Sequence, residues 1–293
     1  MNTTYTLNGH TRLTGLLGSP VSHSISPLMH NEAFHLMQLD YAYLCFETKE
    51  SNLKETIQAL KCLNARGFNC TMPVKTRMYE LADELSPAAS LMKAVNTVVI
   101  ENGKFIGHNT DGIGYMSSVK EAGFDIIGHK MTLLGAGGAA TAIAVQAALD
   151  GVSEIAIFNR KSRSWTRAQE FTDLLNKNTA CKVSLHDLAD CNELRHQLAD
   201  STLLTNATNV GMAPHTDISP IPEASMLPEH LIVSDIIYNP RKTQLLTQAK
   251  QRGCACFNGL YMLLFQGAEA FRLWTGRDMP VNEIKRKYFS EPF

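Results

Sequence analysis

The chain contains no long apolar segment and no targeting signal. None of its 293 residues falls in a run of about eighteen uninterrupted apolar residues, the length that a membrane-spanning helix needs. The N-terminal sequence MNTTYTLNGHTRLTG lacks the basic start and continuous apolar core of a signal peptide. We therefore expect a cytoplasmic protein that does not associate with a membrane.

An excess of charge of either sign is also missing. The formal net charge is -1, with 19% charged and 44% apolar residues, which is typical of a globular protein. Such a balance gives no overall attraction to nucleic acid or to anionic lipid. We expect no nucleic-acid partner, and any electrostatic recognition of a ligand has to be local.

The cysteines form no framework. There are seven, an odd number, and their spacing matches neither a disulfide pattern nor paired zinc ligands. Cys254 and Cys256 form a C-x-C that could bind a metal, but they lie in an apolar run without a second ligand pair. We expect reduced, mostly buried thiols and no metal.

The length is sufficient for two domains, and the pattern of short apolar runs between longer helical stretches indicates an α/β fold. In the first segment we expect strands at 13–17, 41–46, 67–70 and 94–100, and helices at 27–37 and 53–63. In the second we expect strands at 131–134, 155–158, 182–185, 203–206 and 231–235, and helices up to 149 and at 165–176. This alternation predicts a mostly parallel, doubly wound sheet of the Rossmann type.

A glycine-rich turn follows the first strand of the second segment. Gly135, Gly137 and Ala140 fit the G-x-G-x-x-G/A fingerprint between a predicted strand and a predicted helix. Such a turn brings backbone N–H groups and a helix N-terminus close to a pyrophosphate. A small-residue turn without a ligand is the alternative, and the position of the motif favours a dinucleotide.

An acidic residue is missing where it would select NAD. The second strand of this segment ends in Asn159 and Arg160, followed by Lys161, Ser162 and Arg163. A carboxylate at that place would bind the ribose 2'-hydroxyl, whereas a cationic group suits a 2'-phosphate. We therefore predict NADP, with NAD still open. A solvated basic start of a helix is the alternative.

Polar loops punctuate the first segment. They are GSPVSHSISP with Ser24 and Ser26, NCTMPVK with Thr71 and Lys75, AVNT with Asn96, and HNTDG with Asp111. Taken singly, each has an ordinary structural reading: helix caps for the serines and Asp111, a surface lysine, and a turn-forming asparagine.

Together and in this order, these motifs resemble the shikimate/quinate dehydrogenase family over nearly the whole chain. LLGAGGAA, FNRK, TNAT, DIIYNP and NGLYMLLFQGAEAF also fall where that family has its motifs. The resemblance implies a fold with an N-terminal α/β substrate domain (1–111 plus about 260–293), a Rossmann domain (about 112–259) and an active-site cleft between the domains. The implied substrate ligands are Ser24, Ser26, Tyr43, Thr71, Lys75, Asn96, Asp111, Tyr238 and Gln266. The implied cofactor contacts are Gly135, Ala136, Gly137, Gly138, Ala139, Asn159, Arg160, Lys161, Thr208, Ile236 and Gly259.

The resemblance also implies a reaction, the reversible NADP-dependent reduction of 3-dehydroshikimate to shikimate in aromatic amino-acid biosynthesis. Removing a carbinol hydrogen as hydride makes the hydroxyl acidic, so a base has to take its proton. Lys75 is the candidate base, and Asp111 is its expected catalytic partner. The residues do not fix the assembly state, and a homodimer is left open.

Three alternatives remain open from the sequence. One is a quinate/shikimate dehydrogenase that uses NAD or both cofactors, and another is a methylenetetrahydrofolate dehydrogenase. The third is a metabolite sensor without catalysis, which the presence of Lys75, Asp111 and the glycine turn disfavours. Two departures from the family pattern, Asn258 for a common Asp and Tyr261 for a common Gly, lie near the expected nicotinamide site.

Overall fold

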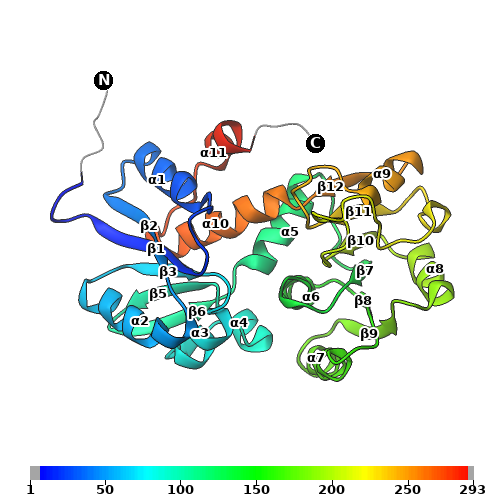
Figure 1. Cartoon of the computed structure of the whole chain (residues 1–293), viewed down its shortest axis with the longest axis horizontal. Coiled ribbons are helices and arrows are strands. Elements are labelled where there is room, and N and C mark those ends of the chain that lie inside the picture. Colours follow the sequence, from blue (N-terminus) through cyan, green and yellow to red (C-terminus); the bar gives the residue numbers. More distant parts are fainter. Residues whose placement is uncertain (1–6, 290–293) are drawn as a thin grey trace. The chain divides into compact units, whose positions relative to one another are not determined.

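The computed structural model describes residues 7–289, which form two compact units (Figure 1). Unit 1 contains residues 7–110 and 264–289, and unit 2 contains residues 111–263. Each unit has one six-stranded sheet covered by helices. The predicted α/β fold class is therefore confirmed.

Unit 1 is built on a mixed sheet with the strand order β2-β1-β3-β5-β6-β4. Strand β1 is parallel to β2 and β3, whereas β5 is antiparallel to both β3 and β6. The elements in chain order are β1 (Arg12–Gly18), α1 (Ser26–Leu36), β2 (Tyr41–Glu47), the short 3-10 helix η1 (Glu50–Asn52), α2 (Leu53–Cys62), β3 (Gly67–Cys70), α3 (Lys75–Leu81), β4 (Glu84–Leu85), α4 (Pro87–Met92), β5 (Thr97–Glu101) and β6 (Lys104–His108).

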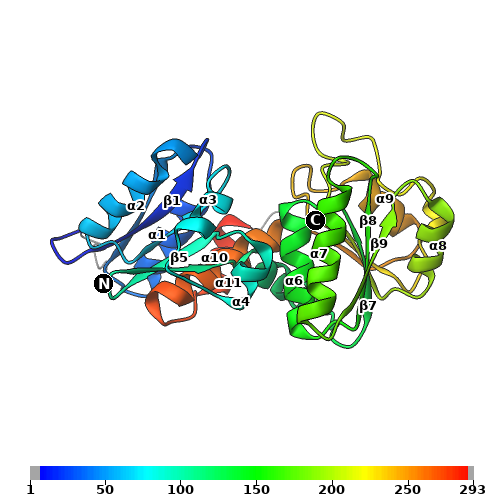
Figure 2. The ribbon, with the colours of Figure 1, turned by 90° about the horizontal axis from the view of Figure 1, so that it is seen from below.

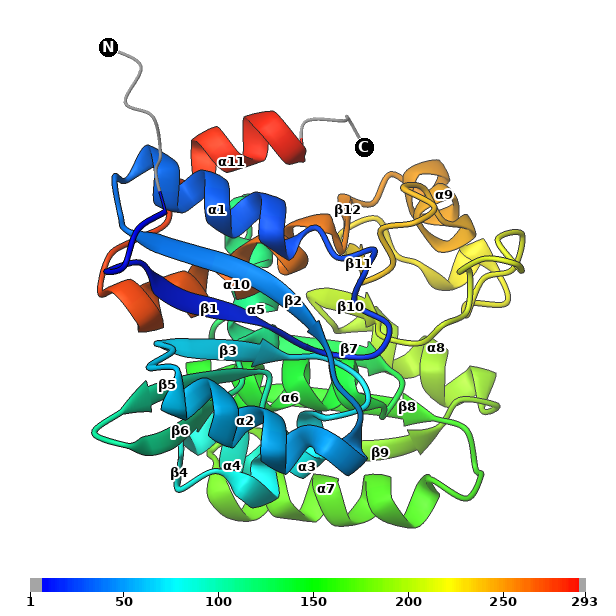
Figure 3. The same cartoon turned by 60° about the vertical axis from the view of Figure 1, so that its left-hand side comes forward.

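Helices cover both faces of this sheet. Figure 3 shows α1 on one side of β1 and β2, and α2 and α3 on the other. Helix α2 buries Leu53, Ile57 and Leu60, which recur at the spacing of one helical face. They join Phe68 and Val98 of the sheet in one apolar cluster. This packing fixes where β3 ends, and with it the start of α3.

Two C-terminal helices follow unit 2 in the chain. Helix α10 (Leu260–Thr275) begins in unit 2 and continues into unit 1, and α11 (Val281–Tyr288) follows it. In unit 1, the Trp274 indole of α10 donates a hydrogen bond of 2.9 Å to the Val98 carbonyl of β5. Lys287 of α11 forms an ion pair of 2.7 Å with Glu32 of α1. The second part of α10 and the whole of α11 thus pack against elements of unit 1.

Unit 2 has a fully parallel sheet with the order β12-β11-β10-β7-β8-β9. This is the strand order of a Rossmann fold. From β7 the chain first adds β8 and β9 on one side, and then β10, β11 and β12 on the other. The elements are α5 (Asp111–Glu121), β7 (Lys130–Leu134), α6 (Gly138–Asp150), β8 (Glu154–Asn159), α7 (Trp165–Asn178), β9 (Lys182–Asp187), α8 (Cys191–Ala199), β10 (Leu203–Asn206), the short 3-10 helix η2 (Ala224–Met226), β11 (Ile232–Asp235), α9 (Gln244–Gln251) and β12 (Cys256–Asn258). Figure 2 shows α6 and α7 on one face of this sheet, and α8 and α9 on the other.

Several boundaries differ from the sequence-based expectation. The strand expected from Ala94 begins only at Thr97, and before it the Val95 N–H bonds to the Lys75 carbonyl of α3, outside the sheet. In the NCTMPVK segment only Thr71 to Val74 form a loop, since Asn69 and Cys70 end β3 and α3 starts at Lys75. The serines are not conventional caps: the N-cap of α1 is Ile25, without a side-chain hydrogen bond.

Candidate active site

The polar loops of unit 1 meet at one edge of its sheet. Ser24 and Ser26 follow the carboxyl end of β1, and Thr71 follows that of β3. Because β5 runs antiparallel to β3, its first residue, Thr97, pairs with Asn69 at the same edge. The carboxyl end of β6 lies beside it, since Thr97 also pairs with His108. The topology therefore gathers side chains that are far apart in the sequence.

A buried network of amides and hydroxyls connects these strand ends. The Asn96 side-chain oxygen accepts from the Thr110 N–H at 2.8 Å, and its amide donates to the Thr110 hydroxyl at 3.0 Å. The Asn69 amide donates to the Thr97 hydroxyl at 2.9 Å and to the Asn96 carbonyl at 3.1 Å. The Tyr43 hydroxyl in turn donates to the Asn69 side-chain oxygen at 2.8 Å. The Asn96 side chain is thus held by buried hydrogen bonds to Thr110, which the interpretation as a simple turn former did not include.

Tyr43 and Asn69 occupy the interior of unit 1. Tyr43 is fully buried, and burial raises the pKa of its hydroxyl well above the ordinary value. Asn69 was not among the predicted site residues, although a buried asparagine in the strand GFNC is the kind of signal that could have identified it. A contact between Tyr43 and the substrate stays a prediction.

Lys75 is the first residue of α3 and is half-buried. Its backbone carbonyl accepts the Val95 N–H at 3.0 Å, which ties the start of α3 to the AVNT turn. Burial raises the pKa of the Cys70 thiol, and the positive charge of Lys75 opposes that shift. The Lys75 ammonium therefore acts electrostatically on the carboxyl end of β3.

The remaining predicted substrate residues lie at element ends or on α10. Ser24 accepts the Ser26 N–H at 3.2 Å, so one of the two serines does support the start of α1. Gln266 is a half-buried residue of α10. In unit 2, Asp111 is the half-buried first residue of α5 and follows Thr110 directly, and Tyr238 is exposed after β11.

The glycine turn of unit 2 has the geometry that a pyrophosphate requires. Gly135 has φ +102°, and a Cβ there would lie 3.0 Å from the Ala207 carbonyl oxygen. Gly137 and Gly138, at the start of α6, have open space where a Cβ would project. The N-terminus of α6 has no side-chain cap. Because its N–H groups are not capped by a side chain, this turn fits the phosphates of a dinucleotide.

The basic loop after β8 lies at the carboxyl edge of the same sheet. Asn159 ends β8, Arg160 is exposed, and Lys161 places its ammonium 5.6 Å from the centre of the Trp165 ring. The Lys161 ammonium also lies 3.7 Å from the Asp187 carboxylate of β9. The loop therefore offers cationic groups beside the end of the second strand of the Rossmann unit.

A second buried network fixes the loops after β10 and β11. Asp235 accepts hydrogen bonds from the Thr243 hydroxyl at 2.7 Å and the Asn206 amide at 3.0 Å. Burial raises the pKa of Asp235 to about 6, while these hydrogen bonds act in the opposite direction. The Asn206 side-chain oxygen accepts from the Thr208 N–H and hydroxyl, at 3.1 and 2.7 Å. The predicted cofactor residue Thr208 is thereby held by the sheet.

Two further predicted cofactor residues contact each other. A Cβ on Gly259 would lie 1.9 Å from the Ile236 carbonyl oxygen, so only glycine allows this approach between the ends of β11 and β12. Nearby, the Asn258 amide donates to the Arg241 carbonyl at 3.0 Å and its side-chain oxygen accepts the Leu260 N–H at 3.1 Å. The amide donor would be lost with the Asp that is common in the family.

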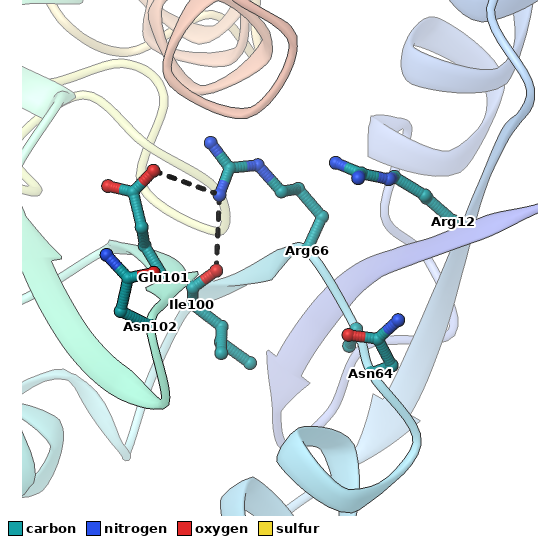
Figure 4. Close-up of a pocket in the computed structure, with 7 residues that line it drawn as sticks. Arg12, Asn64, Arg66, Ile100, Glu101 and Asn102 are labelled. Carbon is teal, nitrogen blue, oxygen red and sulfur yellow. Dashed lines mark hydrogen bonds and ion pairs between the residues drawn. The ribbon is translucent and has the colours of Figure 1, made fainter.

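A cavity of about 150 Å³ lies at the other edge of the unit 1 sheet (Figure 4). It is lined by Arg12, Asn64, Ala65, Arg66, Ile100, Glu101 and Asn102. The Arg66 guanidinium donates to the carbonyls of Trp274 at 2.9 Å and Ile100 at 3.2 Å. This arginine joins α10 to the sheet, so we assign it a structural role, remote from the polar loops.

The described residues, 7–289, contain neither a membrane-spanning helix nor a cluster of metal ligands. No helix in that range is long and apolar enough to cross a membrane. The same residues hold no group of three or more His, Cys, Asp or Glu side chains that could hold a metal ion.

Comparison with known proteins identifies the family. Residues 16–98 match the model of the shikimate dehydrogenase substrate binding domain, and residues 259–287 match that of the shikimate 5'-dehydrogenase C-terminal domain. The chain is 52% identical to the shikimate dehydrogenase (NADP(+)) of Listeria monocytogenes serotype 4b, over 97% of each sequence. The chain belongs to the shikimate dehydrogenase family.

Solved structures of the shikimate dehydrogenase family share the fold. A shikimate 5-dehydrogenase from Listeria monocytogenes, solved in complex with shikimate and NAD, is 52% identical with a TM-score of 0.93. That match covers 96% of this chain and 97% of the other. A shikimate dehydrogenase in complex with NADP+ is 38% identical with a TM-score of 0.85, covering 96% of each chain. The resemblance drawn from the motifs is confirmed, whereas the roles of single residues stay predictions.

Proposed function

We propose that the chain is an oxidoreductase that reversibly reduces 3-dehydroshikimate to shikimate with NADPH, a step of aromatic amino-acid biosynthesis. The observation that carries the proposal is 52% identity over 97% of the chain to a shikimate dehydrogenase (NADP(+)). A relative with the same identity was solved with shikimate bound. The polar edge of unit 1 and the glycine turn of unit 2 supply the chemistry that such a reaction requires.

Substrate recognition is assigned to the polar edge of unit 1. A ring acid with several hydroxyls needs many directional donors and acceptors, which the hydroxyls of Ser24, Ser26 and Thr71 and the amide of Asn96 provide. We assign Tyr43, Tyr238 and Gln266 to the same ligand. The buried bonds of Asn96 to Thr110 keep its amide in one orientation, which favours a defined pose of the ring.

Cofactor binding is assigned to the carboxyl edge of the unit 2 sheet. Gly135 to Ala139 would hold the pyrophosphate, and Asn159, Arg160 and Lys161 would meet the adenosine ribose and its 2'-phosphate. Thr208, Ile236 and Gly259 would line the nicotinamide side. When bound, NADPH would supply the hydride that reduces 3-dehydroshikimate, and NADP+ would accept it in the reverse direction. The relative from Listeria monocytogenes solved with NAD supports some use of NAD as well.

We assign the transfer of the proton at the reacting oxygen of the substrate to Lys75 and Asp111. As the carbonyl of 3-dehydroshikimate becomes a hydroxyl, its oxygen needs a proton, and a lysine ammonium can donate it. In the reverse direction the same nitrogen accepts the hydroxyl proton. A carboxylate can orient a lysine ammonium and a substrate hydroxyl, which is the role that we propose for Asp111.

The test of the function is the absorbance of reduced nicotinamide with shikimate or quinate, each combined with NADP or NAD. Rapid reduction with shikimate and NADP is the expected result. A preference for quinate would assign the chain to the quinate-using branch. Binding of shikimate without turnover of any pair would contradict catalysis and support a sensor.

Replacing the proposed base gives the first prediction. Lys75→Ala should lower kcat by about 100 to 10,000-fold, the usual contribution of a positioned acid or base. Lys54→Ala, which removes an exposed lysine from α2 of the same unit, should leave kcat unchanged. The measurement is steady-state turnover of shikimate, with an unfolding curve to show that both variants fold. Near-normal turnover of Lys75→Ala would remove the assignment.

Location and assembly are part of the proposal. All seven cysteines are free, which supports a reducing compartment such as the cytoplasm. Fractionation of the source cells tests this location. A homodimer stays a prediction, and sedimentation equilibrium of the purified protein would decide it.

A further inference from the structure

A carboxylate lies beside the basic loop, although the carboxyl end of the second strand of the Rossmann unit has none. Asp187 is the last residue of β9, and it pairs in register with Asn159, the last residue of β8. Neighbouring strands lie about 4.8 Å apart, so the two side chains share the same part of the sheet edge. The Leu188 N–H, which donates to the Asn159 carbonyl at 3.0 Å, extends this connection beyond the strands.

The Asp187 carboxylate is aimed at the loop. One oxygen, Oδ1, accepts the Ala189 N–H at 3.1 Å, which fixes the rotamer. The other, Oδ2, lies 3.7 Å from Lys161 Nζ. The Asp187 side chain is 24% exposed and that of Lys161 is 67% exposed. The carboxylate is therefore the fixed partner, and the lysine is the one that can turn toward another anion.

We propose that Asp187 is a specificity-determining residue that allows this enzyme to use NAD beside NADP, by supplying from β9 the carboxylate that the carboxyl end of β8 lacks. The inference rests on the proposed function, because it assumes that the adenosine ribose lies at Asn159. There Asp187 accepts a hydrogen bond from the 2'-hydroxyl of NAD. With NADP, the 2'-phosphate draws Lys161 and Arg160 toward itself against the repulsion of the same carboxylate.

The size of the effect follows from the charges. Two unit charges about 6 Å apart in water interact by enough to change an affinity roughly threefold. Losing the hydrogen bond from the ribose 2'-hydroxyl lowers the affinity for NAD by a similar factor. Removing the charge of Asp187 should therefore shift the preference toward the 2'-phosphate by roughly tenfold in all.

The experiment measures binding by calorimetry with two fragments that carry no nicotinamide, ADP-ribose and 2'-phospho-ADP-ribose. Asp187→Asn keeps the shape and the acceptor for Ala189 and removes the charge. It should bind 2'-phospho-ADP-ribose about threefold more tightly and ADP-ribose about threefold more weakly. Asp173→Asn, which removes an exposed carboxylate from α7, should change neither affinity by more than about twofold.

A second variant separates specificity from folding. Lys161→Ala keeps Asp187 and should weaken 2'-phospho-ADP-ribose alone. A ratio of the two affinities in Asp187→Asn within twofold of the unsubstituted protein, or a shift toward ADP-ribose, would overturn the proposal, as would no binding of either fragment to the unsubstituted protein. Because neither fragment can transfer hydride, a shifted ratio without turnover of shikimate would sink the proposed function and leave this inference standing.

Discussion

At the scale of single residues, His30 is the most unusual side chain of unit 1. It is fully buried, and neither ring nitrogen has a hydrogen-bond partner among the described residues. Its ring stacks on Tyr43 at 4.5 Å between centres and lies 5.3 Å from that of Trp274. Burial lowers the pKa of His30 from 6.5 to about 3, so the imidazole is neutral in the folded protein.

Because His30 is buried and neutral, we expect the free energy of unfolding to fall in acid. The unfolded chain takes up a proton at His30 below about pH 6.5, whereas the folded chain resists until about pH 3, so falling pH favours unfolding. At pH 5 the loss attributable to His30 is about 2 kcal/mol. His30→Phe should lose correspondingly less between pH 7 and pH 5, measured by urea unfolding at both values. Equal losses in the two proteins would show that His30 is not buried and neutral.

At the scale of elements, two glycines that both belong to the predicted cofactor site have different reasons to be glycine. Gly137 precedes α6 in an extended conformation, with nothing within 4 Å of an added Cβ. Gly259 precedes α10 with its backbone against Ile236. The first leaves room for a ligand, and the second allows two segments of the chain to touch.

The two alanine variants should therefore fail in different ways. Gly137→Ala should unfold within about 0.5 kcal/mol of the unsubstituted protein, yet bind NADP at least tenfold more weakly, because its methyl group occupies the place of a phosphate oxygen. Gly259→Ala should lose about 2 kcal/mol or more, because the β11 loop has to move. Urea unfolding and NADP titration check both. If Gly137→Ala were destabilised but bound NADP with normal affinity, the claim that Gly137 leaves room for a phosphate would be wrong.

The sequence predicted the elements with strong periodicity and missed those whose position depends on tertiary contacts. The strand from Met131 and the glycine turn after it were visible, since apolar runs and glycines act locally. The sequence did not show that Asn69, Asn96 and Thr110 meet, because their meeting requires β5 to run antiparallel to β3. Asp187 was missed for the same reason, since only strand pairing places it beside Asn159.

At the scale of the whole molecule, the thiols give a simple test of the structure. Cys62 and Cys191 are exposed, while burial raises the pKa of the other five: Cys45, Cys70, Cys181, Cys254 and Cys256. Because the thiolate is the reactive form, Ellman's reagent should titrate two thiols quickly in the native protein and seven in urea. Replacing Cys62 and Cys191 by Ser should abolish the fast phase. More than two fast thiols would contradict the shielding of the other five, of which Cys70, Cys181 and Cys254 are buried and Cys45 and Cys256 are half-buried.

The fold of unit 1 also has a consequence during synthesis on the ribosome. Its sheet is complete by Thr110, but Trp274 and α11, which pack on that sheet and on α1, are translated after the whole of unit 2. Translation proceeds at roughly 5 to 20 residues per second. The aromatic side chains of His30, Phe34 and Tyr43 are therefore made on the order of ten to thirty seconds before α10, which packs on them. Unit 2 is contiguous and can fold in that interval, so the nascent N-terminal segment keeps apolar surface exposed after unit 2 has been made.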